Sequence, residues 1–71
     1  MKSIWRAQKA GASIECVVAA GCHGTELQVI EGEMVTRRER LADRSTAYER
    51  ARNLRLEYLA AGYEVEFSCR A

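Results

Sequence analysis

The sequence predicts a small α+β domain in which a single helix covers one face of an antiparallel sheet. Three observations support this prediction. Apolar and polar residues alternate in the first part of the chain, and short glycine-containing turns interrupt them, which favours strands joined as a meander. A capped helical segment follows at residues 47–61, and Gly62 alone separates it from an alternating segment at residues 63–69. The expected order is β-β-β-β-α-β, in two layers, within a single domain spanning residues 1–71.

Four strands are expected before the helix, at residues 3–9, 14–19, 25–30 and 34–41. Alternation groups Trp5 and Ala7 on one face of the first strand, with Ile4 on the other face. It groups Ile14, Cys16 and Val18 on one face of the second strand, and it directs Leu27 and Val29 of the third strand inward. Residues 31–33 form a hairpin turn in this prediction, because Gly32 can adopt the positive φ that a tight turn needs.

The register of the strand at residues 34–41 stays open at this point, because loops of two and of three residues direct opposite residues inward. We adopt the register that places Val35 inward. Thr36, Arg38 and Arg40 then lie on the open face of the sheet, beside Gln28.

The helix has signals at both ends. Asp43 and Ser45 are residue types that cap helices, and the run from Thr46 to Glu49 fits the capping-box pattern. Steps of three and four residues form a stripe that faces the sheet: Ala47, Ala51, Leu54, Tyr58 and Ala61. Gly62 suits the left-handed conformation that often follows a helix end.

Leu56 does not belong to this stripe. At about 100° per residue it lies opposite the core face, and Leu59 and Ala60 flank it. It is either a single surface leucine, which is common in soluble proteins, or part of a patch that contacts a partner. A chain of 71 residues buries only about 60% of its unfolded surface, which adds to the expectation of a homodimer that uses Leu56 and Leu59.

Composition indicates a globular protein, with 48% hydrophobic residues, 30% charged residues and a net charge of +1. We expect neither a signal peptide nor a membrane span, because no stretch approaches ~18 apolar residues, and we therefore expect a cytoplasmic protein. Three cysteines are an odd number, which argues against a closed disulfide framework. Cys16 and Cys69 are expected on apolar faces as small hydrophobic residues.

Cys22 and His23 are neighbours in a glycine-flanked turn. Whether Cys16 and Cys69 converge with them stays open. Adjacent cysteine and histidine chelate a metal poorly, and the sequence has no Cys-x-x-Cys pair. His23 would also point away from Cys22 on an extended backbone, so it is not expected to activate the thiol. We expect no metal site, no cofactor, no small-molecule substrate and no enzymatic activity.

Four arginines cluster around the last strand before the helix: Arg37, Arg38, Arg40 and Arg44. They are suited to following a phosphate backbone, with base stacking from Trp5 or Tyr63 if either ring is exposed on the open face. The alternative is a solvated surface of ion pairs, since the pI is ≈ 7.7. Three glutamates are available as cross-strand partners for these arginines: Glu26, Glu31 and Glu39.

The segment at residues 43–52, closing with Leu59-Ala60-Ala61-Gly62-Tyr63, resembles the tail of several small bacterial β-meander-plus-helix families of uncharacterised function. It is also similar to the end of WGR domains, where a hydroxyl-capped helix ends in a glycine-aromatic pair. The resemblance covers about the last third of the chain. The resemblance to WGR domains implies contact with nucleic acid. The Trp-Gly-Arg signature itself is absent, because Trp5 and Arg6 are adjacent.

The sequence thus predicts a non-enzymatic module for protein interaction and self-association, with nucleic-acid binding through the arginine-rich strand as the alternative. Nucleic-acid binding predicts that Arg37, Arg38 and Arg40 share an exposed face with few carboxylates. Protein interaction predicts an exposed apolar patch around Leu56 and Leu59, or an unpaired apolar sheet edge.

Overall fold

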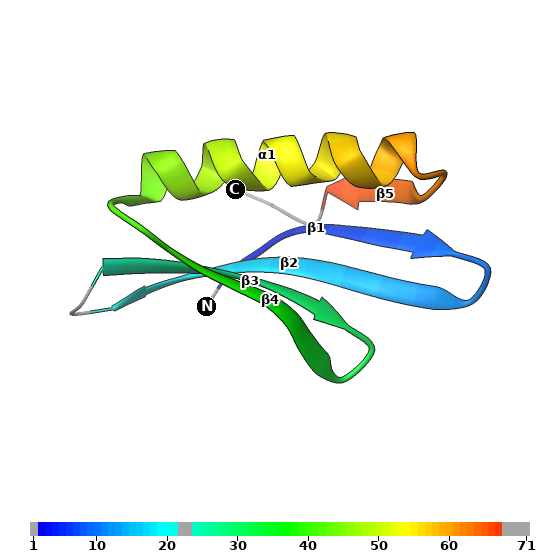
Figure 1. The fold of residues 1–71 in the computed structure, drawn as a ribbon, viewed down its shortest axis with the longest axis horizontal. Coiled ribbons are helices and arrows are strands. Elements are labelled where there is room, and N and C mark those ends of the chain that lie inside the picture. The colour runs from blue at the N-terminus through cyan, green and yellow to red at the C-terminus, as the bar shows by residue number, and fades with distance from the viewer. Residues whose placement is uncertain (1, 22–23, 68–71) are drawn as a thin grey trace.

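The computed structural model describes residues 2–21 and 24–67. It contains β1 (Lys2–Lys9), β2 (Ala12–Gly21), β3 (Gly24–Glu31), β4 (Met34–Leu41), α1 (Arg44–Ala60) and β5 (Glu64–Phe67). Figure 1 shows α1 lying along one face of the sheet. The predicted two-layer α+β fold, with its antiparallel meander and its β-β-β-β-α-β order, is confirmed.

The strands are arranged in space as β4-β3-β2-β1-β5. The order of the first four is that of a simple meander, and β5 adds to the far side by pairing antiparallel with β1. Since α1 follows β4 and precedes β5, the helix carries the chain from one edge of the sheet to the other (Figure 1). β4 and the shorter β5 are therefore the two edge strands.

The core lies between α1 and the inner face of β1, β2 and β3. Its buried residues are Trp5, Ala7, Ile14, Cys16, Val18, Leu27, Val29, Ala47, Ala51 and Leu54. Strand alternation grouped the strand residues of this set by face and the helical stripe named its helix residues, and the structure shows that the grouped faces of β1 and β2 turn toward α1. Ile4 is a correction, because a bulge between Ser3 and Trp5 makes it an extra residue. It packs half-buried against the core instead of lying on the opposite face.

Trp5 connects the sheet to the helix at the centre of this core. Its indole Nε1 donates a hydrogen bond of 2.9 Å to the Ala51 carbonyl, so the one polar group of the ring has a partner in the buried interior. Its ring centroid lies 5.5 Å from that of Tyr58, and Tyr58 in turn meets Tyr63 edge-on at 5.3 Å. The small Ala51 allows the sheet to approach the helix this closely.

The helix begins earlier than the capping-box pattern predicted. Asp43 is the N-cap, and its Oδ1 accepts a hydrogen bond of 2.8 Å from the Thr46 backbone amide. Thr46 is therefore the third residue of the helix and not its cap. The Asp43 carboxylate takes that role because it can accept the free amide directly, and this hydrogen bond lowers the pKa of Asp43. At the other end, Gly62 has the expected positive φ, of 96°.

The register of β4 corrects a second prediction. The turn after β3 has two residues, with Gly32 at φ 64°, and Ile30 lies opposite Val35. A bulge then makes Thr36 an extra residue, and its hydroxyl donates to the Val29 carbonyl at 3.3 Å. Val35 is thus on the outer face with 40% of its surface exposed, so its predicted inward placement is wrong.

Candidate interaction surfaces

The bulge at Thr36 decides which way the arginines of β4 point. Beyond it, Arg37 lies opposite Val29 on the helix-facing side of the sheet, whereas Arg38 lies opposite Gln28 on the outer face. Arg40 shares that outer face, as predicted, and Arg44 begins α1. The four arginines therefore occupy three separate places. The condition that Arg37, Arg38 and Arg40 share one exposed face is not met.

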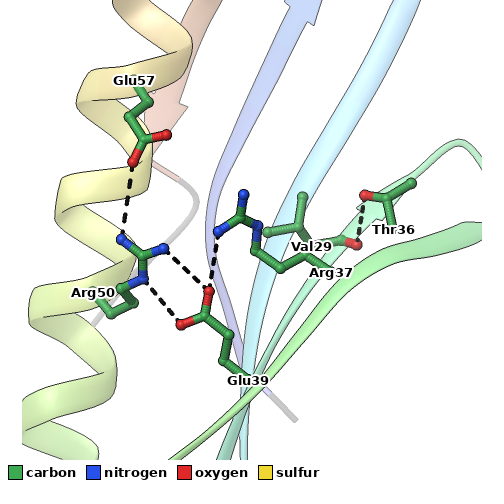
Figure 2. A network of polar contacts seen from close by, with 6 residues as sticks. All are labelled: Val29, Thr36, Arg37, Glu39, Arg50 and Glu57. Carbon is green, nitrogen blue, oxygen red and sulfur yellow. Dashed lines mark hydrogen bonds and ion pairs between the residues drawn. The ribbon is translucent and has the colours of Figure 1, made fainter.

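Arg37 belongs to a polar network that joins β4 to α1, and Figure 2 shows how its members converge on Glu39. Arg50 donates to both Glu39 oxygens, at 3.0 and 3.2 Å, and Arg37 donates to Oε2 at 3.1 Å. Arg50 also lies 3.9 Å from Glu57. The hydrogen bond from Arg50 is the main cause that lowers the pKa of Glu39 below its ordinary value of 4.5. This network holds the edge strand against the helix.

We expect Glu39→Gln to lower the free energy of unfolding by about 1 kcal/mol or less at neutral pH, because the network is partly exposed to solvent. Folding lowers the pKa of Glu39, so its ionised form stabilises the fold above the unfolded-state pKa. That contribution is lost as pH falls through the lower folded-state pKa. The difference between variant and wild type should therefore shrink below about pH 4.5, which urea unfolding over a pH series would measure. Glu33→Gln, in the exposed turn, is the control, and an equal pH dependence in both variants would contradict the prediction.

The outer face of the sheet mixes both signs of charge. Arg38 Nε lies 3.7 Å from Glu26 Oε1, and the same carboxylate accepts a hydrogen bond of 2.6 Å from Gln28. On the neighbouring strands, Arg6 Nε lies 3.5 Å from Glu15. Arg40 lies opposite Glu26 but forms no ion pair within the part of the chain that the structure describes. Arg38 and Arg40 are thus the arginines of β4 that remain directed toward solvent on this face.

Neither aromatic ring named for base stacking lies free on this face. Trp5 is fully buried in the core. Tyr63 is half-buried, packs against Tyr58, and has the Lys9 ammonium 5.5 Å from its ring centroid. Lys9 also donates a hydrogen bond of 2.6 Å to the Ala61 carbonyl, which caps the end of α1. The same lysine lines a surface groove of about 500 Å³.

Among the residues whose burial is described, large apolar side chains are exposed in two places. On α1, Leu56 is 53% exposed and Leu59 is 42% exposed, as their positions away from the core stripe predicted. At the start of β4, Met34 is 70% exposed beside Val35. The second pair was missed, because the predicted register turned Val35 inward. The two-residue turn at Gly32 was the signal that could have placed it outward.

Cys16 is buried in the core. Burial raises the pKa of its thiol to about 12, so the nucleophilic thiolate is not formed at neutral pH. Cys22, His23 and Cys69 lie outside the described residues. The expectations about these three residues therefore stay predictions. Within residues 2–21 and 24–67 no group of three side chains is arranged to hold a metal ion.

No helix of the described segments has the length and apolar character needed to cross a membrane. The chain matches no protein-family model, no curated protein and no solved structure. The similarity to WGR domains stays a prediction.

Proposed function

We propose that this chain is a non-enzymatic protein-interaction module that self-associates through the outer face of α1. The observation that carries the proposal is the exposure of Leu56 and Leu59 on the side of the helix turned away from the sheet. They lie three residues apart, so their side chains are neighbours on the helix surface. Ala51 and Leu54 on the opposite side are fully buried, so the core does not need these two leucines.

Self-association would remove this apolar surface from water. In an antiparallel pair of α1 helices centred between the two leucines, Leu56 of one copy meets Leu59 of the other, and the two contacts are equivalent by symmetry. Fully burying an exposed leucine contributes about 1.5–3 kcal/mol, and Leu56 and Leu59 are 53% and 42% exposed, so about half of that contribution remains to be gained at each. A chain of this size has a small core of its own, so the added burial is a substantial gain.

Nucleic-acid binding has less support. Arg37 is engaged by Glu39, Arg38 has Glu26 as a neighbour, and Trp5 is unavailable for stacking because it is buried. Binding through Arg38, Arg40 and Arg44 is therefore kept as the alternative that the same experiment tests.

The experiment is light scattering of the purified chain over a concentration series, with and without a short mixed-sequence oligonucleotide at two salt concentrations. We expect a dimer whose mass does not respond to the oligonucleotide. Leu56→Glu should produce the monomer mass, because a charge would be buried between the two helices. The matched control is Ser45→Glu, which places the same charge at an exposed position of the same helix, eleven residues from Leu56, and should leave the dimer intact.

A monomer at every concentration, or a Leu56→Glu variant that still dimerises, would overturn the proposal. A mass increase with the oligonucleotide that weakens with salt and disappears in Arg38→Glu would favour the alternative instead.

A further inference from the structure

β4 is an exposed edge of the sheet. It pairs with β3 on one side and has no strand on the other in the described part of the chain. Its eight residues are exposed except for Glu39 and Leu41, which are half-buried. Along such an edge, alternate residues direct backbone N–H and C=O groups toward solvent, where another strand can pair with them.

This edge is positively charged. Arg38 and Arg40 are two residues apart on the outer face, and the Arg38 side chain is 62% exposed. Arg37 is on the helix-facing side with 42% of its side chain exposed. The one carboxylate of the strand, Glu39, is already bound by Arg37 and Arg50. An incoming strand therefore meets unpaired backbone groups together with an excess of arginine.

A second copy of β4 does not fit this edge. Residues opposite each other in an antiparallel pair point to the same face, so a two-fold pairing must be centred on one residue. Centring it on Arg37, Arg38 or Arg40 places that arginine opposite itself. Centring it on Glu39 places that glutamate opposite itself and Arg38 opposite Arg40. Like charges directly opposite are destabilising, so each of these four registers disfavours self-pairing.

We propose that the β4 edge binds an extended acidic segment of a partner protein by strand addition. Side chains of a strand alternate between faces, so the segment carries acidic residues at alternate positions, facing Arg38 and Arg40. Main-chain hydrogen bonds supply affinity and the charges supply selectivity. Exposed Met34 and Val35 lie at the start of the strand, where an apolar residue of the partner gains a contact. This surface does not include Leu56 or Leu59, so it is independent of the self-association of α1.

The probe is a fluorescent ten-residue peptide of alternating threonine and glutamate with blocked ends. Its binding to the full chain would be followed by fluorescence anisotropy, and amide hydrogen exchange would be followed by NMR. We expect saturable binding and slower exchange at alternate amides of β4. A peptide of the same length and charge, with proline in place of each threonine, should not bind, because proline cannot donate to the ladder.

The variant pair tests the charges. Arg38→Gln combined with Arg40→Gln should weaken peptide binding about tenfold, from the loss of two cross-strand charge pairs. Arg44→Gln combined with Arg52→Gln removes the same net charge from exposed positions of α1 and should leave binding close to that of the wild type. Leu56→Glu should also bind the peptide normally, whether or not the dimer exists.

Several outcomes would overturn the proposal: no binding, equal binding of the proline peptide, equal loss in both double variants, or unchanged exchange at β4. Displacement of the peptide by an oligonucleotide that itself protects β4 would assign the surface to nucleic acid. The exchange measurement on the wild-type chain needs no substitution, so it decides the question even where a variant folds poorly.

Discussion

Trp5→Ala is expected to lower the free energy of unfolding by about 3–5 kcal/mol. Trp5 is fully buried, so its removal leaves a large cavity between the sheet and α1. The hydrogen bond to the Ala51 carbonyl and the ring contact with Tyr58 are lost with it. A chain of this length has a total stability of only about 4–11 kcal/mol at ~0.05–0.15 kcal/mol per residue. The variant should therefore be largely destabilised or unfolded.

Urea unfolding followed by far-ultraviolet circular dichroism would measure this, because the signal of α1 does not depend on the tryptophan. Trp5→Phe separates two causes, since it keeps an aromatic ring in the core and removes the indole N–H. We expect Trp5→Phe to be intermediate. Met34→Ala is the exposed control, because Met34 is 70% exposed and lies outside the proposed dimer surface, and it should change stability by about 0.5 kcal/mol or less. A Trp5→Ala variant with the wild-type unfolding midpoint would contradict the central position of this side chain.

Ala51→Leu is expected to destabilise the fold by about 1–3 kcal/mol through overpacking. Ala51 is fully buried where α1 approaches Trp5, so three added carbons have no space unless the helix moves away. Such a movement would lengthen the hydrogen bond from the Trp5 indole. Leucine is also a good helix former, so the expected loss comes from packing and not from helix propensity.

Ser45→Leu is the control, because it introduces the same residue at an exposed position of the same helix, eleven residues from Leu56. It should change stability by about 0.5 kcal/mol or less. Thermal unfolding of the two variants, with near-ultraviolet circular dichroism to report the environment of Trp5, would separate them. Equal unfolding temperatures would show that the contact between α1 and the sheet tolerates a larger residue than its burial implies.

The candidate surfaces were predictable to different degrees. Leu56 and Leu59 were expected to be exposed, because a helix with a clear core stripe leaves the positions opposite that stripe in solvent. The separation of Arg37 from Arg38 and Arg40 follows from strand alternation alone, and the adopted register already placed only Arg38 and Arg40 on the open face. The bulge at Thr36 decides that Arg38 and Arg40 share the outer face with Val35, and nothing in the local pattern of β4 marks that bulge.

The sequence by itself determined the element types and which residues of each element share a face. Alternation in β1, β2 and β3 and the three-and-four spacing in α1 are local properties, and they grouped the core residues correctly because one face of each element must leave water. The exception is Ala61, which was included in the helical stripe but is the exposed C-cap of α1. Only the tertiary structure decided that β5 pairs with β1, that Thr36 is bulged and that β4 remains an open edge. These features depend on contacts between residues far apart in the chain, whose energies no local pattern contains.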